Sequence, residues 1–140
     1  MQYPYTYDDL LFRIHTEKCS EEVYNKINLP ALKCRRHNRS TVIINFSLYP
    51  EKLKRTKDQL SDYFKTETGS PNSINQNGQL VIQCIINEHK CETLLKNYIK
   101  EYVMCRQCKC LDTSLIKEVG LNFLQCYQCH AKTSLGKIYI

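Results

Sequence analysis

The sequence predicts an α+β fold in which an N-terminal helix precedes a small α/β core domain and a C-terminal ribbon held by four cysteines. Three observations predict it: apolar residues at helical spacing near the start, strand and helix patterns in the middle, and two Cys-x-x-Cys pairs near the end. A hydrophobic content of 42% in 140 residues is enough for a packed core. The predicted parts are the helix (1–24), a basic linker (25–40), the core domain (41–104) and the ribbon (105–140).

The predicted N-terminal helix, residues 7–17, has one apolar face. Its apolar side chains recur at the i, i+3, i+4, i+7 spacing of an amphipathic helix: Tyr7, Leu10, Leu11 and Ile14. Asp8 and Asp9 lie in the first turn, where the helix dipole favours negative charge. No neighbouring helix in the sequence covers this stripe. We therefore expect it to dock on another chain or to fold back on the core.

Two strands are predicted in the core domain. Residues 41–46 are rich in β-branched side chains and predict a buried strand. Asn77 and Gly78 form a turn signal, and residues 79–86 after it predict the second strand.

Helices are predicted on either side of that second strand. Residues 47–68 are helical in composition, in two pieces, and Gly69 lies where a left-handed C-terminal cap is expected. Residues 91–103 predict a last helix that runs directly into the ribbon. Its apolar residues share the helical spacing: Leu95, Tyr98, Ile99 and Tyr102.

The ribbon is predicted to hold one metal ion. Cys105 and Cys108 are followed, after seventeen residues, by Cys126 and Cys129, which matches the general spacing of structural zinc sites. Two residues between paired cysteines let one tight turn direct both sulfurs at a single ion, and the strand formers in the spacer bring the two turns together. Four thiolates leave no open position on zinc, so the site is expected to be structural.

Disulfides are the alternative use of these cysteines. The chain has nine cysteines, an odd number, and its first residues lack the pattern of a signal peptide. In a reducing compartment, two Cys-x-x-Cys pairs more often hold a metal. The remaining cysteines share no spacing and are expected to be small buried or half-buried side chains: Cys19, Cys34, Cys84, Cys91 and Cys110.

Positive charge is concentrated in the middle and at the end of the chain. Residues 1–32 carry three basic and five acidic side chains, whereas residues 33–69 carry nine and four, and residues 105–140 carry five and two. This asymmetry suggests a polyanionic partner for the later parts. A well-solvated basic surface is the alternative.

No motif supports an enzymatic or a membrane function. The chain has only four glycines, no phosphate-binding Gly-rich loop, and no HExxH or GxSxG pattern. No apolar run approaches the roughly 20 residues that span a bilayer. We therefore expect a non-enzymatic protein of the cytosol or nucleus.

The sequence from the core into the ribbon resembles a known family. YIKEYVMCRQCKCLDT (98–113) and FLQCYQC (123–129) are similar to the segment that contains the zinc ribbon of the beta subunit of translation initiation factor 2. The resemblance extends back through residues 74–82 and 41–46, and YTYDDLLFR (5–13) looks like the N-terminal helix of that family. Nearly the whole chain is covered.

The resemblance implies a non-catalytic subunit of a cytoplasmic heterotrimer that carries initiator methionyl-tRNA, with GTP, to the small ribosomal subunit. It implies that the stripe of Tyr7, Leu10, Leu11 and Ile14 docks on the gamma subunit, which is the GTPase. It also identifies the polyanion as RNA. The basic side chains expected to contact the RNA backbone are Lys33, Arg35, Arg36, Arg39, Arg106, Lys109, Lys117, Lys132 and Lys137.

Some features depart from that family. Its eukaryotic members have a long lysine-rich extension before the helix, whereas Met1 lies only a few residues ahead of the helix here, so the contacts of that extension are expected to be absent. Lys65 and Thr68 replace leucines, which thins the apolar face of one core helix. The short form fits either a reduced cellular subunit or a virus-encoded copy.

Two other functions share parts of the pattern. The GTPase-activating N-terminal domain of initiation factor 5 has the same core and ribbon, but it depends on an arginine in a flexible tail, and Arg13 is predicted to be helical. A zinc-ribbon factor acting with RNA polymerase would explain the ribbon but not the similarity over residues 41–104.

Overall fold

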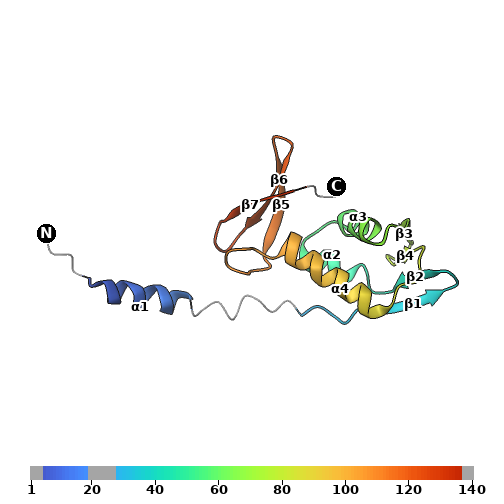
Figure 1. Cartoon of the computed structure of the whole chain (residues 1–140), viewed down its shortest axis with the longest axis horizontal. Coiled ribbons are helices and arrows are strands. Elements are labelled where there is room, and N and C mark those ends of the chain that lie inside the picture. The colour runs from blue at the N-terminus through green and yellow to red at the C-terminus, as the bar shows by residue number, and fades with distance from the viewer. Residues whose placement is uncertain (1–4, 19–27, 137–140) are drawn as a thin grey trace.

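Two antiparallel sheets, one of four strands and one of three, form the body of the protein (Figure 1). The computed structural model describes residues 5–18 and 28–136, without the side chains of residues 15–18. Mixed helices and sheets with a small core confirm the expected α+β class. Within the described ranges, no helix is both long and apolar enough to cross a bilayer.

The first helix, α1, spans Tyr7–Lys18, close to its predicted bounds. Thr6 begins it with a reciprocal pair of hydrogen bonds. The Asp9 backbone N–H donates to Thr6 Oγ1 at 3.3 Å, and the Thr6 backbone N–H donates to Asp9 Oδ2 at 3.1 Å. The Thr6 hydroxyl and then its backbone N–H, by hydrogen bonding to the carboxylate, lower the pKa of Asp9. The start of α1 is therefore fixed by local sequence.

The four-stranded sheet has the order β1-β2-β4-β3, with β1 at Cys34–His37, β2 at Ser40–Ile43, β3 at Asn72–Ile74 and β4 at Leu80–Ile82. Thr41 lies opposite Ile82, and Ile43 lies opposite Leu80. All four of these side chains are buried, whereas the alternate positions of both strands are only partly buried. One face of the sheet is therefore the core face.

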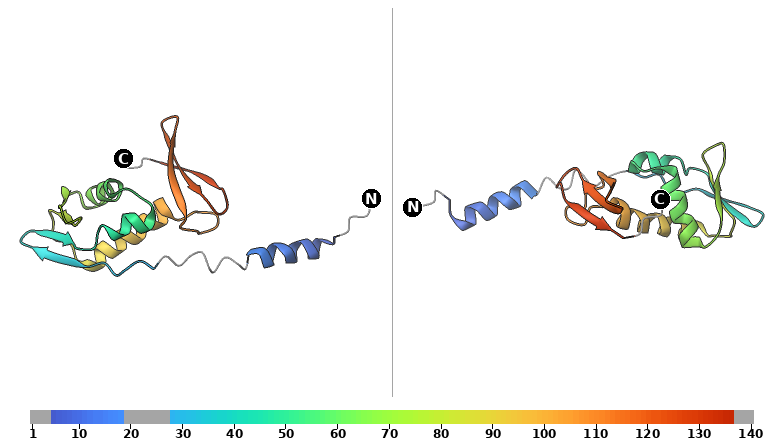
Figure 2. Two further views of the ribbon diagram at one scale, coloured as in Figure 1. Left: turned by 180° about the vertical axis from the view of Figure 1, so that it is seen from behind. Right: turned by 90° about the horizontal axis from the view of Figure 1, so that it is seen from above.

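Helices cover that core face (Figure 2). They are α2 at Leu48–Leu53, α3 at Lys57–Thr68 and α4 at Glu88–Tyr98, which continues as the π-helix η2 at Ile99–Val103. As predicted, Gly69 ends α3 in the left-handed conformation, with φ 62°. Aromatic rings fill the centre of the core, with neighbouring ring centroids 5.0–6.5 Å apart: Phe46, Tyr63, Phe64, Tyr98 and Tyr102.

The three-stranded sheet of the ribbon has the order β5-β6-β7, at Thr113–Glu118, Leu121–Cys126 and Lys132–Leu135. Val119 and Gly120 form the tight turn between β5 and β6, and both have positive φ, at 49° and 77°. Two successive residues with positive φ give the turn a twist that matches the right-handed twist of the flanking strands.

The predicted basic linker contains a strand. Residues 34–37 form β1, which pairs with β2 in a hairpin, so the sheet begins inside the range 25–40. Asn38, at φ 56°, turns the chain between the two strands. The sequence of β1 is Cys-Arg-Arg-His, without β-branched residues or apolar alternation, and only pairing with β2 makes it a strand.

Both predicted core strands are longer than the observed ones. Where the observed strands stop, side chains take the place of a neighbouring strand and hydrogen-bond to the backbone. Asn45 Nδ2 donates to the Ala31 carbonyl at 2.8 Å, and Asn45 Oδ1 accepts from the Lys33 N–H at 3.0 Å. The Thr41 hydroxyl donates to the Cys84 carbonyl at 2.8 Å and accepts from the Ile86 N–H at 3.0 Å. These bonds satisfy the backbone where the strands stop.

Thr56→Ala is expected to destabilise the core by about 1 kcal/mol. Thr56 caps α3 by accepting the Gln59 N–H at 3.3 Å, and the Gln59 side chain accepts the Thr56 N–H in return. Urea unfolding followed by circular dichroism measures the change. Thr66→Ala is the control, because Thr66 lies inside the same helix and only bonds back to the Asp62 carbonyl. An equal loss in both variants would contradict the capping role.

Candidate metal centre

The four predicted ligands meet beside the ribbon sheet. Cys105 and Cys108 follow η2, Cys126 ends β6, and Cys129 lies in the turn to β7. All four Sγ atoms lie within 4.8 Å of one another, with 3.6 Å between Cys105 and Cys129 and 3.5 Å between Cys108 and Cys126. A tetrahedral zinc ion with Zn–S bonds of about 2.3 Å has S–S edges of about 3.8 Å. The cluster therefore has the size of a four-thiolate zinc site.

Two turns of the same shape carry the pairs. In the first, the Cys105 N–H donates to the Cys110 carbonyl at 2.9 Å, and Lys109 has φ 61°. In the second, the Cys126 N–H donates to the Ala131 carbonyl at 3.0 Å, and His130 has φ 56°. The left-handed residue and the closing bond fall at the same offsets from the first cysteine of each pair. This repeat directs two thiols inward from each side.

The thiols are held in a half-buried, hydrogen-bonded setting. Cys105 and Cys126 are buried, Cys108 is half-buried and Cys129 is exposed. Burial acts to raise the pKa of Cys105, but N–H groups of Cys108 and Gln107 together with the neighbouring thiols lower it to about 7. Burial, followed by the neighbouring thiols, raises the pKa of Cys108 to about 12. Zinc binds cysteine as the thiolate, so metal binding at such a site releases protons.

The other cysteines and His130 take no part in the four-thiol group. Cys110 is buried next to it, and its Sγ accepts the Asp112 N–H at 3.4 Å. Among the described residues, the remaining cysteines are buried or half-buried, as predicted: Cys34, Cys84 and Cys91. Cys19 lies outside the described residues.

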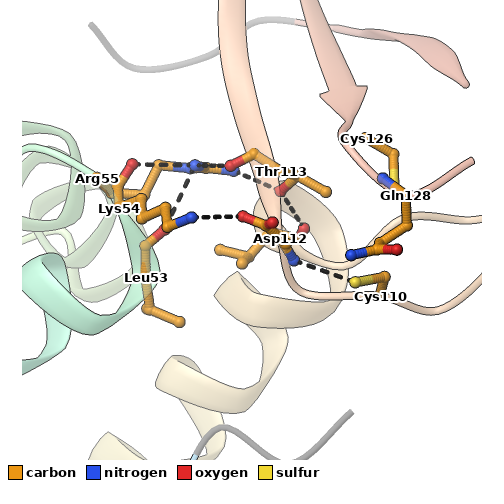
Figure 3. Close-up of polar contacts among 9 residues, drawn as sticks. Leu53, Lys54, Arg55, Cys110, Asp112, Thr113, Cys126 and Gln128 are labelled. Carbon is orange, nitrogen blue, oxygen red and sulfur yellow. Dashed lines mark hydrogen bonds and ion pairs between the residues drawn. The ribbon is translucent and has the colours of Figure 1, made fainter. Parts of the chain in front are cut away.

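Arg55 joins the ribbon to the core (Figure 3). It lies between α2 and α3, and only 8% of it is exposed. Its Nη1 donates to the Thr113 carbonyl at 2.7 Å, and its Nη2 donates to Thr113 Oγ1 at 2.8 Å and to the Tyr102 carbonyl at 3.0 Å. The Thr113 hydroxyl in turn donates to the Val103 carbonyl. One side chain thus fixes α2, η2 and β5 to one another.

Among the described residues, no carboxylate pairs with the buried Arg55 guanidinium, which instead lies at the end of a helix. Tyr102 and Val103 end η2, where the last carbonyls lack helical partners and the dipole favours a cation. Burial lowers the pKa of Arg55, but a guanidinium remains protonated at neutral pH. Lys54 adds an exposed ion pair with Asp112, with Nζ and Oδ1 2.6 Å apart.

Sequence reasoning missed Arg55. Residues 51–65 mix basic and acidic side chains, which is typical of a solvated surface, but Arg55 is buried. The helix-capping pattern begins only at Thr56, so no local signal marks its neighbour as buried. The contact spans 58 positions in the sequence and depends on tertiary structure.

Most of the predicted RNA-contacting side chains are exposed, in two separate groups. Lys33, Arg35, Arg36 and Arg39 lie on or next to the β1–β2 hairpin, and Arg106, Lys109, Lys117 and Lys132 lie on the ribbon. Two of them have partners: Arg36 Nη2 donates to Asn87 Oδ1 at 2.9 Å, and Lys132 pairs with Glu118. Lys137 lies outside the described residues.

The apolar stripe of α1 is exposed to solvent. Tyr7, Leu10, Leu11 and Ile14 are each between 38% and 77% exposed. Folding back on the core, one of the two expectations for this stripe, is therefore not what the structure shows. Arg13 is helical, as predicted, and lies over the Tyr5 ring at 5.8 Å from its centroid.

The fold and the site define a class of protein: a small helix-covered sheet with a four-cysteine ribbon fixed to its C-terminal end. Comparison with known proteins identifies the family. The family model of the domain found in initiation factor 2 beta and initiation factor 5 matches residues 17–132.

Curated relatives agree with that match. Translation initiation factor 2 subunit beta of Sulfurisphaera tokodaii is 36% identical over 106 residues, 76% of each chain. The subunit beta of Archaeoglobus fulgidus is 31% identical over 135 residues, 95% of this chain and 98% of its own. Eukaryotic translation initiation factor 2 subunit 2 of Drosophila melanogaster is 33% identical over 96% of this chain and 45% of its own. The chain belongs to the family of initiation factor 2 beta subunits.

Proposed function

We propose that the chain acts as the beta subunit of translation initiation factor 2 in the cytoplasm. In this role it is a non-catalytic part of the GTP-dependent heterotrimer that delivers initiator methionyl-tRNA to the small ribosomal subunit. The observation that carries the proposal is the alignment with the archaeal subunit of Archaeoglobus fulgidus, which covers 95% of one chain and 98% of the other. Such coverage includes the N-terminal helix, the core and the ribbon together.

We infer that one zinc ion binds Cys105, Cys108, Cys126 and Cys129. The size of the cluster and its donor set of four thiols fit a closed tetrahedral site. Zinc there has the structural task of holding the two turns together, because all four positions are occupied by protein. The ribbon alone is too small to fold on its buried apolar surface.

The stripe of α1 is proposed to dock on the gamma subunit. Four apolar side chains on one face of an exposed helix suit an apolar groove on a partner. The basic side chains of the ribbon and of the hairpin, other than Arg36, are proposed to contact RNA phosphates, which position RNA without reading its sequence. Arg36 instead donates to Asn87 Oδ1.

Leu10→Asp/Leu11→Asp is expected to weaken binding to the cognate gamma subunit by more than about a hundredfold, because an unpaired carboxylate would be buried at an apolar interface. A pull-down followed by calorimetric titration measures the loss. Arg13→Glu is the matched control, since it changes the net charge by the same two units but lies off the stripe. Equal binding by the double variant and the wild type would reject docking through this face.

A GTPase-activating role like that of initiation factor 5 is the second candidate, since the matching family includes that factor by name. The activator depends on an arginine in a flexible tail. Here Arg13 lies within α1, over the Tyr5 ring. This placement favours the beta-subunit role, and a measurement of GTP hydrolysis with added protein separates the two.

A further inference from the structure

The outer face of the four-stranded sheet forms an open groove. The volume of the groove is about 750 Å³, and its lining comes from β1, β2, β4 and the turn between β3 and β4. Strand alternation places Val42 and Val81 on this face, opposite each other in neighbouring strands. Together with Ile44, which is 42% exposed, they make an apolar floor. The helices cover the other face.

Polar and basic side chains surround this floor. Arg35 and His37, two residues apart on β1, lie along one side. Ser40, Asn75 and Gln79 add hydroxyl and amide groups that donate and accept hydrogen bonds. Among the residues that the structure describes, no aspartate or glutamate lines the groove. The site therefore combines a positive edge, an apolar base and hydrogen-bonding groups.

We propose that this groove binds single-stranded RNA. The positive edge, without a carboxylate in the described lining, is complementary to a phosphate backbone. Arginine and histidine offer flat groups on which unstacked bases stack, and the amides of Asn75 and Gln79 reach base edges. A double helix keeps its bases stacked inside, so it cannot place them on the Val42–Val81 floor. This inference rests on the proposed function. It specifies which face of the protein contacts RNA and that the RNA is single-stranded.

The two adjacent arginines of β1 lie on opposite faces of the sheet. Arg35 lines the groove, whereas Arg36 alternates to the other face and donates to Asn87 Oδ1 at 2.9 Å. Both are exposed and carry the same charge. Comparing substitutions of the two arginines therefore distinguishes binding in the groove from attraction by net charge.

The test measures binding of a fluorescein-labelled twelve-nucleotide oligouridylate by the full chain with its zinc, using fluorescence anisotropy. Arg35→Gln/His37→Gln is expected to weaken binding by about tenfold or more, because it removes two stacking groups and one phosphate contact. Arg36→Gln, with the same change in formal charge, is expected to stay within about twofold of wild type. Arg35→Gln alone should reduce the slope of log affinity against log salt by about 0.7. In wild-type protein, RNA should shift the amide resonances of Val42 and Val81.

Several results would overturn the proposal. Equal weakening by the double variant and by Arg36→Gln would mean that net charge alone attracts RNA. Equal affinity for a duplex of the same length would mean that bases do not enter the groove. Displacement of the RNA by polyglutamate at matched charge would assign the groove to acidic peptides. Gamma-subunit binding by the same variants is read separately, so failure of the groove and failure of the proposed function remain distinguishable.

Discussion

Cys126→Ser is expected to abolish stoichiometric zinc binding and to unfold the ribbon. Structural zinc contributes about 10–16 kcal/mol of apparent binding free energy in small zinc-finger peptides, which is comparable to the whole stability of a typical domain. Cys126 is buried and supplies one of four sulfurs, so three thiols and a hydroxyl remain. Elemental analysis of purified protein reports the metal, and amide hydrogen exchange over residues 105–136 reports the fold.

Cys110→Ser provides the matched control. Cys110 is buried in the first of the two turns but lies outside the four-thiol group, and its Sγ accepts the Asp112 N–H. This variant should retain one zinc ion per chain and slow exchange in the ribbon. If Cys126→Ser retained its zinc, or if both variants lost it equally, the assigned ligand set would be wrong.

Arg55→Met is expected to destabilise the protein by about 2–4 kcal/mol. The methionine keeps part of the apolar stem but leaves the carbonyls of Thr113 and Tyr102 buried without their donors, at about 1–3 kcal/mol each. The loss of stability is expected at the junction of core and ribbon, because those carbonyls belong to β5 and η2. Urea unfolding gives the free energy, and hydrogen exchange at Thr113 locates the change.

Lys54→Met tests whether charge alone explains that loss. Lys54 is adjacent in sequence and pairs with Asp112, but its side chain is 65% exposed. Solvent screens exposed ion pairs, which contribute little to stability, so this variant should remain close to wild type. Similar unfolding midpoints for the two variants would contradict the assignment of Arg55 as the junction residue.

The parts of the structure that were predictable are those set by short-range chemistry. The bounds of α1 follow from its apolar spacing, and the end of α3 follows from Gly69. The four-cysteine cluster was predictable because the Cys-x-x-Cys spacing is typical of tight turns that direct paired thiols at one point, and those turns require few other residues. In each case the signal lies within a few positions of the feature.

The missed parts depend on contacts distant in sequence. The strand Cys34–His37 carries no strand pattern and exists because it pairs with β2. Arg55 is buried because Thr113 and Tyr102, 58 and 47 positions away, require donors. Arg35 and Arg36 are adjacent in the sequence, but Arg35 lines the groove and Arg36 donates to Asn87. Their separation onto two faces follows from strand alternation, which a predicted linker lacks.

The packed tyrosines of the core make the two halves of the protein separately observable by spectroscopy. The chain has no tryptophan, so its ultraviolet absorption comes mainly from ten tyrosines. Tyr63 and Tyr98 are buried with ring centroids 5.0 Å apart; burial raises the pKa of Tyr98 to about 12 and that of Tyr63 as well. Their phenolate bands should therefore emerge in alkali only as the core opens. Cobalt bound at the four cysteines in place of zinc would add visible absorption bands that report on the ribbon. The unfolding of the core and of the ribbon could then be followed in one sample.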